Sequence, residues 1–449
     1  MWDDRLFLLY LPGHMTTELS DDRLSDQERL RRLPWLYAHS GANSVFSVLT
    51  WFGPVFVLFL SEIGLPKTRI GILLSFLPFS GVLALLIAPA VARAGVRRVF
   101  LVCWALRKGV TTLLLLTPWM VLQHGAEGAF LFVGALIALF AVLRAVGETA
   151  WYPWSQELVP NAIRGRVQGV SNIVTLLTSS LALAGASWVL DHGEGLSRFT
   201  TLIGIGVVAG IICVVCALPL PGGNPGERHR TTAHTDAMWG ALQDHRFRFY
   251  LAYTALTLVT MQSVFAAFVP LFMKEQVGLP SSHVVLLDVA AYFCGVLSSY
   301  GWGAWADRAG SRPLVPILLL MALLPLLWME MPRHSEFSFA AALGIAGLAG
   351  VVTTGWWVAD QRLLFVEIVP SEKRTEYMAI YYAWIGLVGG CGPLICGPLL
   401  DHFQGFKAQL GPLMLDSYSP LFAGSVALLG LGLVMLSLLR RRLREVALP

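Results

Sequence analysis

Long apolar stretches alternate with short polar segments along almost the whole chain. Each stretch is long enough to cross the roughly 30 Å hydrocarbon layer of a bilayer as a helix, which takes about 20 residues. Because a bilayer has no water to satisfy backbone groups, and because the alternating pattern of barrel strands is not found, we expect helices. The predicted spans are 41–62, 69–92, 98–121, 127–150, 166–190, 199–220, 249–273, 283–306, 313–331, 338–360, 376–400 and 418–440.

Two polar segments of the sequence occur twice. Residues 157–164 read ELVPNAIR and residues 367–374 read EIVPSEKR, an offset of 367 − 157 = 210. Residues 92–97 read ARAGVR and residues 307–312 read DRAGSR, an offset of 307 − 92 = 215. Two segments that repeat at nearly the same long period indicate a chain built from two copies of one unit. The predicted fold class is an all-α integral membrane protein, with twelve transmembrane helices in two pseudo-symmetric six-helix bundles.

The polar segments divide the chain into five predicted parts. Residues 221–247 are rich in glycine, proline and charge, which is typical of a linker. The first 35 residues lack the pattern of a cleavable signal; we interpret residues 19–35 as a polar surface helix, with Met1 and Met15 as alternative starts. The parts are a cytoplasmic tail 1–35, an N-terminal six-helix bundle 36–220, a cytoplasmic linker 221–247, a C-terminal six-helix bundle 248–440 and a cytoplasmic tail 441–449.

Composition excludes a water-soluble class of protein. Apolar residues make up 56% of the chain and charged residues 13%, whereas globular proteins average about 45–50% and about 25%. The formal net charge of +4 does not indicate a nucleic-acid partner, because the 32 Lys and Arg cluster in short loops. Most of these cations lie in the loops on the side of the N-terminus, which predicts that both termini are cytoplasmic and that the protein spans the plasma (inner) membrane.

Neither a metal site nor a cofactor is predicted. The six cysteines all lie inside apolar segments, so neither a disulfide framework nor a zinc site is indicated. The sequence contains no Walker A motif and no glycine-rich phosphate loop, which disfavours ATP-driven transport. No catalytic residue is predicted, because the histidines are single and scattered rather than arranged as His-Glu-x-x-His. The chain is therefore not expected to be an enzyme.

Loop motifs carry a resemblance to a known family. Residues 303–312 read GAWADRAGSR between spans eight and nine, residues 93–98 read RAGVRR as its echo, and a Val-Pro-x-x-x-Arg element precedes spans five and eleven. With two six-span halves in parallel repeat, the chain between residues 36 and 440 resembles the major facilitator superfamily. The resemblance implies a secondary transporter whose halves rock about a site near the midplane of the membrane.

The same resemblance implies that the loop motif is a latch on the cytoplasmic side. The predicted latch residues are Arg93, Gly95, Arg97, Asp307, Arg308, Gly310 and Arg312. Glycine suits the turn because it enters the left-handed region without cost, and an arginine can bridge to a carboxylate across the two bundles. Ala92 stands where the family's first aspartate is expected, so we expect Asp307 and Arg308 to carry the latch. The alternative to a latch role is that the arginines only anchor these loops on the cytoplasmic side, as the positive-inside rule predicts.

Ionisable residues inside the spans are candidates for function, because a charge at bilayer depth costs roughly 2.5–3.5 kcal/mol. Arg144 and Glu148 lie four residues apart on one face of span four. We predict that they line a central cavity and bind an anionic or zwitterionic substrate or exchange a proton. The alternative is an internal ion pair, with Arg107 or Lys108 as a third member, that locks spans three and four. For Arg107 and Lys108 the structural role is the favoured one.

Further candidates lie on spans one, seven, eight and ten. The predicted cavity set is completed by Asn43, Trp51, Gln262, Trp356 and Asp360, on helices that line the cavity in the family. Interfacial aromatic belts and hydrogen bonds between packed helices are the alternative explanation for these side chains. Asp288, about one turn inside span eight, is predicted to gate the outer mouth or to take a proton.

The predicted function is secondary active transport of a small organic solute by alternating access, coupled to protons. One alternative is a transporter-like membrane sensor that binds its ligand without moving it, and a membrane-embedded enzyme is another. The predicted partners are the small-molecule substrate, protons and the lipid bilayer, with no nucleic acid. One chain contains both halves, so we expect a monomer. The solute, the direction of transport and the coupling ion stay open at this point.

Overall fold

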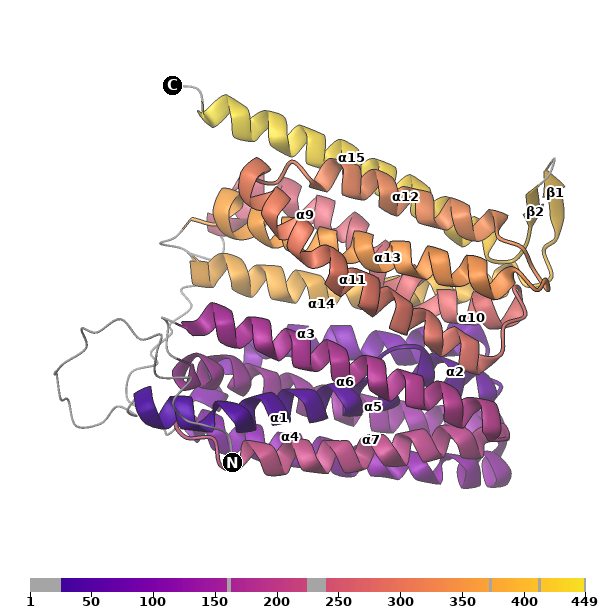
Figure 1. Cartoon of the computed structure of the whole chain (residues 1–449), viewed down its shortest axis with the longest axis horizontal. Helices are drawn as coiled ribbons and strands as arrows, with labels where there is room; N and C mark the ends of the chain where they lie inside the picture. The colour runs from indigo at the N-terminus through magenta and orange to yellow at the C-terminus, as the bar shows by residue number, and fades with distance from the viewer. Residues whose placement is uncertain (1–25, 160–162, 224–239, 371–373, 411–412, 448–449) are drawn as a thin grey trace.

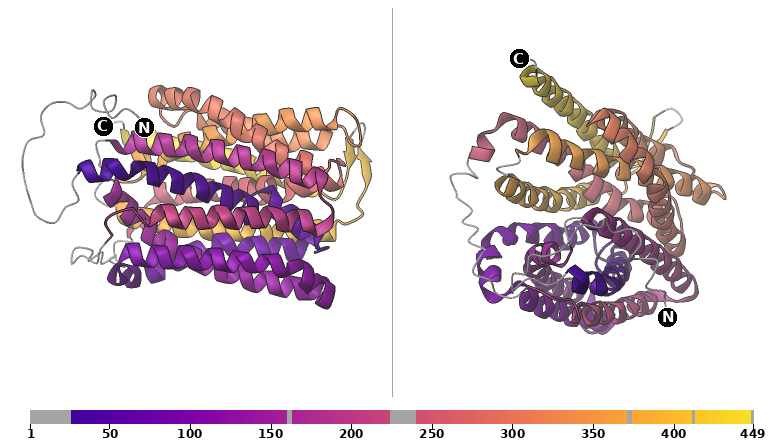
Figure 2. Two further views of the ribbon diagram at one scale, coloured as in Figure 1. Left: turned by 60° about the horizontal axis from the view of Figure 1, so that its bottom comes forward. Right: turned by 60° about the vertical axis from the view of Figure 1, so that its left-hand side comes forward.

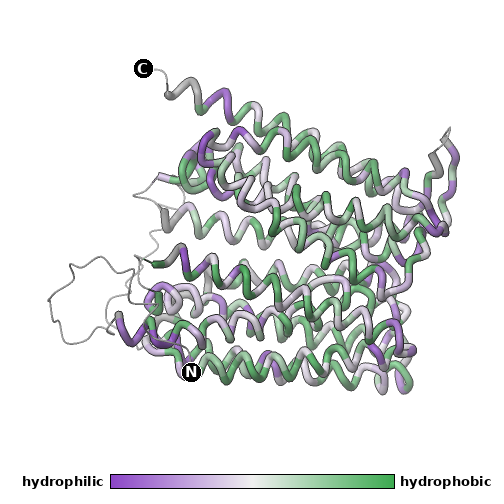
Figure 3. Tube along the Cα trace, in the orientation of Figure 1, coloured by the Kyte–Doolittle hydropathy of each residue, from purple (hydrophilic) through white to green (hydrophobic). Residues whose placement is uncertain are grey.

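The computed structural model describes residues 26–159, 163–223, 240–370, 374–410 and 413–447 of the chain. Long helices run side by side along the long axis of the molecule, and the two halves of the sequence form two layers (Figure 1). Hydrophobic residues follow the helices over most of their length, whereas hydrophilic residues gather towards the helix ends (Figure 3). This distribution fits helices that cross a bilayer.

Each half of the chain forms one helical bundle. The elements of the N-terminal bundle are α1 (Asp26–Thr50), α2 (Pro54–Glu62), α3 (Lys67–Ala94), α4 (Val96–Leu113), η2 (Leu114–Leu116), α5 (Thr117–Leu158), α6 (Arg164–His192) and α7 (Gly195–Ala217). Those of the C-terminal bundle are α9 (His245–Leu258), η4 (Val259–Phe268), α10 (Val269–Glu275), α11 (Ser281–Ala309), α12 (Leu314–Glu330), α13 (Ser338–Arg362), η5 (Leu363–Ile368), α14 (Arg374–His402), β1 (Ala408–Leu410), β2 (Leu413–Leu415) and α15 (Ser419–Ala447). The antiparallel hairpin of β1 and β2 was not predicted from the sequence.

The all-α membrane fold predicted from hydropathy is confirmed. Nine helices among the described residues are long and apolar enough to cross a membrane. One of them, residues 96–158, is a hairpin rather than a single pass: Gly125 has non-helical angles (φ 63°, ψ −168°), and the rings of Phe100 and Trp151, almost equidistant from Gly125 along the chain, lie 4.9 Å apart. Together with α3 and the shorter apolar α12, the hairpin is consistent with the predicted twelve passes.

Span one begins earlier than predicted and is broken near its middle. α1 starts at Asp26, inside the predicted tail 1–35, because the polar surface helix continues directly into the span; residues 1–25 lie outside the described part. α1 ends at Thr50 and α2 begins at Pro54, with Gly53 at φ 94° between them. Position 263 (53 + 210) of span seven falls in the π-helix η4. Equivalent positions of the repeat therefore depart from α-helix in both bundles. Non-helical backbone is tolerated at membrane depth where protein surrounds it.

The bundles meet along two pairs of helices, α3 with α14 and α6 with α11. Glycine lets the first pair approach closely. A Cβ atom at Gly71 would lie 2.2 Å from the carbonyl oxygen of Pro393, and one at Gly386 would lie 2.8 Å from that of Pro78. Small residues at such contacts allow helix backbones to touch in membranes. Figure 2 shows the two bundles from two further directions.

The helix ends define two faces of the molecule. α7 ends and α9 begins at one face, which we call the linker end, and α1 starts and α15 finishes there as well (Figure 1). α2 ends and α3 begins at the opposite face, the far end, which also carries the β-hairpin. Most of the predicted linker, residues 224–239, lies outside the described part.

Candidate functional site

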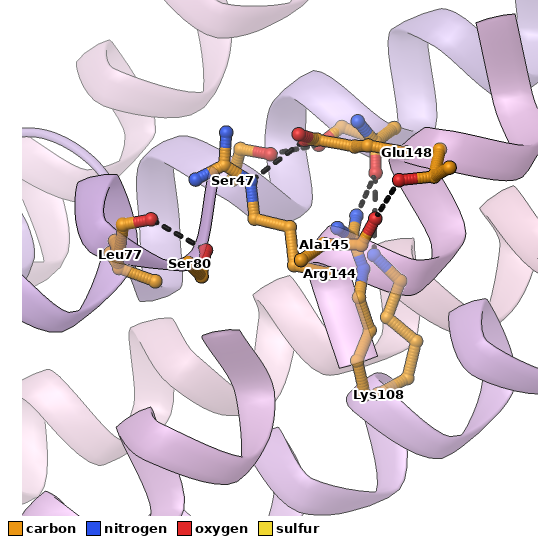
Figure 4. A network of polar contacts seen from close by, with 10 residues as sticks. Ser47, Leu77, Ser80, Lys108, Arg144, Ala145 and Glu148 are labelled. Atoms are coloured by element: carbon orange, nitrogen blue, oxygen red, sulfur yellow. Dashed lines mark hydrogen bonds and ion pairs between the residues drawn. The ribbon is translucent and has the colours of Figure 1, made fainter. Parts of the chain in front are cut away.

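Arg144 and Glu148 form an ion pair on the face of α5 that looks towards the C-terminal bundle. The guanidinium Nε donates to the Glu148 carboxylate at 2.7 Å, and the two side chains are 24% and 36% exposed. Tyr152 lies one further turn along the same face, and its ring stacks on that of Tyr382 of α14, with 6.1 Å between the centroids. Because residues four apart share a helix face, the ion pair points to the interface between the bundles. Figure 4 shows the pair near Ser47 and Lys108.

The break in span one lies between charged groups of the two bundles. The guanidinium carbon of Arg144 lies 4.9 Å from the centroid of the Phe52 ring, at the break. From the other bundle, an Oδ atom of Asp288 on α11 lies 3.9 Å from where a Cβ atom of Gly53 would stand. The structure thus brings Arg144, Glu148 and Asp288 to one region. Broken helices with nearby charges are the usual setting of substrate sites in transporters.

Arg107 and Lys108 are buried inside the N-terminal bundle and do not join the Arg144–Glu148 pair by a direct hydrogen bond. Both donate to the Oδ1 atom of Asn43 on α1, at 2.8 and 3.3 Å. Their charged groups also lie over aromatic rings, at 3.3 Å from the centroid of Trp104 and 3.1 Å from that of Phe46. Such contacts stabilise a desolvated cation. Asn43 is therefore an acceptor that ties α4 to α1.

A second polar cluster lies inside the C-terminal bundle. Asp360 of α13 is fully buried, and its Oδ2 atom accepts from the hydroxyl of Tyr250 at 2.8 Å. One turn away, the indole N–H of Trp356 donates to the hydroxyl of Tyr253 at 2.7 Å. The Oδ1 atom of Asp360 has no hydrogen-bond partner within the described residues. Tyr250 was not a predicted candidate, although its spacing of three from Tyr253 in an apolar span is the signal that points to it.

The remaining two cavity candidates differ in position. Trp51 lies at the break of span one, but its ring is buried, stacks on Phe140 at 4.6 Å and donates to the hydroxyl of Thr111 at 2.8 Å. These partners belong to the N-terminal bundle, so Trp51 packs in its core. Gln262 lies in the π-helix η4 and packs on α14, where a Cβ atom at Gly389 would lie 2.5 Å from its Oε1 atom.

The sequence matches the family model of the Major Facilitator Superfamily over residues 40–359 and again over residues 251–448. The chain belongs to the Major Facilitator Superfamily. The class E tetracycline resistance protein of Escherichia coli is 29% identical over 152 residues, which are 32% of this chain and 34% of that protein. The proton-coupled folate transporter of Rattus norvegicus is 28% identical over 138 residues, 30% of this chain and 29% of that protein. The matched region thus spans about a third of these curated relatives.

Solved structures of Major Facilitator transporters share the fold. A structure of the nucleoside transporter NupG has a TM-score of 0.69 at 13% identity, and covers 90% of this chain and 99% of its own. A bacterial homologue of the iron transporter ferroportin, in an inward-facing state, has a TM-score of 0.66 at 12% identity, over 93% and 99% of the two chains. This chain is therefore a multi-pass membrane protein with the fold of this superfamily of transporters.

The predicted latch of this Major Facilitator chain makes its visible contacts within each bundle. Asp307 accepts from Arg362 of α13, in its own bundle, at 3.1 Å. Arg97 donates to the carbonyl of Leu218 at 2.7 Å. Gly95 and Gly310 take up positive φ angles of 87° and 65°, which suits the tight turn. The other members of the predicted set, Arg93, Arg308 and Arg312, are exposed.

The glutamates of the repeated segment, Glu157 and Glu367, both accept hydrogen bonds from residues outside their own helices. Glu157 accepts from the backbone N–H of Gly223 at 2.9 Å, and Gly223 in turn accepts from the backbone N–H of Arg97. Glu367 accepts from the backbone N–H and the hydroxyl of Ser311, at 3.0 and 2.9 Å. Glu367 thus binds the loop of its latch motif directly, whereas Glu157 reaches the corresponding loop through Gly223.

Proposed function

We propose that the protein is a secondary active transporter, which moves a small organic solute across the plasma membrane by alternating access. The substrate site lies between the bundles, with Arg144 and Glu148 on one side and Asp288 on the other. Both termini face the cytoplasm, as the distribution of Lys and Arg in the loops indicates. The superfamily and the fold support transport. The solutes named for the relatives do not carry over, because each match covers about a third of the chain.

The single observation that carries this proposal is the direction of the Arg144–Glu148 pair. Charges at bilayer depth normally face a protein interior or a wet cavity. This pair is partly exposed and looks towards the other bundle, whereas Arg107 and Lys108 are sealed in the core of their own. An ion pair that only held two helices of one bundle together would not need to face the other bundle. An ion pair that binds a solute between the bundles must face it.

We propose protons as the coupling ion, with Asp288, Glu148 and Asp360 as carriers. A carboxylate away from water is costly unless a cation or several donors stabilise it, so such groups tend to exchange protons. In the described part of the chain, the polar partners of the Asp360 carboxylate are tyrosine hydroxyls such as that of Tyr250, rather than a cation. The name of one relative, the proton-coupled folate transporter, agrees with this choice of ion.

The proposed function is tested in two steps on the purified protein. Thermal stabilisation across a panel of metabolites and drugs identifies the bound solute, because a ligand of the native state raises the unfolding temperature. Uptake and counterflow of that solute are then measured in reconstituted vesicles, with and without a proton gradient. Solute accumulation driven by the gradient supports the proposal. Binding without uptake or counterflow would identify a sensor instead, and an unchanged rate without the gradient would refute proton coupling.

A further inference from the structure

The turn between the first two spans of each bundle is duplicated in sequence and in backbone geometry. Residues 64–66 and 278–280 both read Gly-Leu-Pro, an offset of 278 − 64 = 214. Gly64 and Gly278 have φ angles of 86° and 83°. Pro66 and Pro280 have the same extended conformation, with φ/ψ of −64°/156° and −63°/153°. Each proline precedes the first residue of a helix at the far end, α3 or α11.

A proline at this position leaves the next helix without its usual cap. The first N–H groups of a helix have no partner within it, and a Ser, Thr, Asn or Asp at the N-cap commonly accepts from one of them. Proline has no side-chain oxygen, so neither α3 nor α11 has a side-chain acceptor at its own N-cap residue. An acceptor must therefore come from another part of the structure or from water.

Asp401 supplies this acceptor to α3 from the opposite bundle. Its carboxylate accepts from the backbone N–H of Thr68 at 2.7 Å and from that of Lys67 at 3.2 Å. The negative charge also interacts favourably with the positive end of the helix dipole. Gly397, one turn earlier on α14, allows this approach, since a Cβ atom there would lie 2.5 Å from the carbonyl oxygen of Lys67.

The equivalent aspartate of the N-terminal bundle faces the equivalent turn. Residues 190–192 and 400–402 both read Leu-Asp-His, an offset of 401 − 191 = 210. Asp191, in the last turn of α6, accepts from the hydroxyl of Ser282, in the first turn of α11, at 3.4 Å. Each bundle thus reaches the far-end helix start of the other with the same residue of its repeat. The contact is shorter and double at Asp401, and longer and single at Asp191.

Ion pairs stand beside these contacts. Lys274 of the C-terminal bundle pairs with Glu62 of the N-terminal bundle at 2.9 Å, and Lys67 pairs with Glu275 at 3.0 Å. All four side chains are partly exposed. Salt screens such pairs near water. Asp401 adds to them two charge-assisted hydrogen bonds from backbone N–H groups at the start of a helix, where the helix dipole contributes to the attraction.

We propose that Asp191 and Asp401 form a pseudo-symmetric gate, in which each binds the start of a helix of the opposite bundle while the far end is closed. Asp401 binds backbone N–H groups of α3, and Asp191 binds the hydroxyl of Ser282 on α11. Asp401 is the stronger half. When the bundles tilt and the far end opens, both contacts are lost, and water binds the N–H groups of α3 and the hydroxyl of Ser282. The gate rests on the alternating access of the proposed function, which supplies the motion that these two contacts oppose.

The gate is tested by distance measurements between two spin labels on the full chain in lipid bilayers. The labels are attached to cysteines introduced at Gln123 and Gln404, which are exposed at the far end of the N-terminal and C-terminal bundles. The native cysteines lie within helices, and Cys103, Cys213, Cys216 and Cys396 are buried, so the introduced cysteines react preferentially. Variants with one introduced cysteine measure the background labelling.

Asp401→Ala is expected to raise the ratio of long to short distances about tenfold, as loss of a hydrogen bond to a charged group does. Asp191→Ala raises the ratio less, because its contact is single and longer. Gly397→Ala keeps the carboxylate but separates α14 from α3, and is expected to shift the ratio in the same direction. Glu127→Gln is the matched control, since its pair with Arg69 lies at the far end within one bundle, and leaves the ratio unchanged.

Two results would overturn the gate. One is an unchanged distance distribution in Asp401→Ala, in a preparation that remains monodisperse on size exclusion. The other is an equal rise in Glu127→Gln, because the effect would then belong to any lost carboxylate at this face. The outcome is separable from that of the proposed function. If the distances respond as expected but no uptake is measured, the gate is supported and transport is refuted. If uptake is measured but the distances do not respond, transport is supported and the gate is refuted.

Discussion

At the scale of single residues, Glu148 is the carboxylate whose surroundings point most directly to function. Replacing Glu148 by Gln keeps the shape of the side chain and removes its charge. We expect uptake to fall about tenfold or more, since hydrogen bonds to charged groups contribute about 1.5–3 kcal/mol, and the pH dependence of uptake to change. The unfolding temperature should hardly change, because helical pairs four residues apart contribute only about 0.3–0.5 kcal/mol.

Uptake of the identified solute in vesicles over a series of pH values measures the effect of this substitution. Glu127→Gln breaks another ion pair of the same bundle, that with Arg69, and serves as the control with unchanged uptake. Unchanged solute binding and unchanged pH dependence in Glu148→Gln would assign Glu148 a purely structural role.

Asn43 is a residue whose loss should destabilise the N-terminal bundle. Its Oδ1 atom accepts from both Arg107 and Lys108. Asn43→Ala leaves two buried cations without this acceptor, so we expect the free energy of unfolding to fall by about 1–3 kcal/mol or more. Thermal unfolding in detergent measures it. Asn172→Ala, which removes an exposed acceptor of Gln168 on α6, is the control, and an equal loss in both variants would contradict the assignment.

At the scale of elements, the close contact of α3 with α14 predicts opposite effects for two glycine substitutions. Gly71→Ala places a Cβ atom 2.2 Å from the carbonyl oxygen of Pro393, so the helices must separate. We expect a loss of about 1–3 kcal/mol, as for other overpacked sites. Gly204→Ala on α7 meets nothing within 4 Å, and the better helix propensity of alanine should stabilise the helix by up to about 1 kcal/mol.

Thermal unfolding of the two glycine variants side by side measures these effects. The comparison controls for the general preference of helices for alanine, which is the same at both positions. A stabilising Gly71→Ala, or equal shifts in both variants, would mean that the bundles do not pack as closely along α3 and α14 as the structure shows.

At the scale of the whole molecule, alternating access requires the bundles to move apart at the linker end. The rings of Tyr152 and Tyr382 face each other across the bundles there, with 6.1 Å between the centroids. A short thiol crosslinker in the double variant Tyr152→Cys, Tyr382→Cys should therefore stop uptake, and cleavage of the crosslink should restore it. The two single variants, treated with the same reagent, are the controls. Full uptake by the crosslinked protein would contradict motion at this end.

Much of the fold was predictable because its signals are written along the chain. The length of apolar stretches determines which segments cross a bilayer, and the repeat at offsets of 210 and 215 determines two related halves. The turn glycines Gly95 and Gly310 were predictable for the same reason, since a positive φ angle is a local requirement. The continuity of α1 with the polar segment before it, and the β-hairpin, were missed, because hydropathy describes neither a polar helix end nor a short pair of strands.

The site was predictable only in part. The spacing of Arg144 and Glu148 predicted that they can pair, and they do. Sequence did not decide that this pair faces the other bundle while Trp51 and Trp356 pack in the cores, or that Asn43 holds two cations. In a soluble helix the polar stripe reveals its orientation, but a membrane helix is apolar on its lipid face and on its packed face alike.

The sequence by itself therefore determined the class, the spans and the duplication of this protein, which depend on local composition and on comparison of the chain with itself. Only the tertiary structure decided which charges meet. Asp401 reaches Thr68 across a separation of 333 residues, and Asp360 reaches Tyr250 across 110. Such contacts depend on how far each helix is rotated about its own axis and shifted along it, and packing against neighbours sets both quantities.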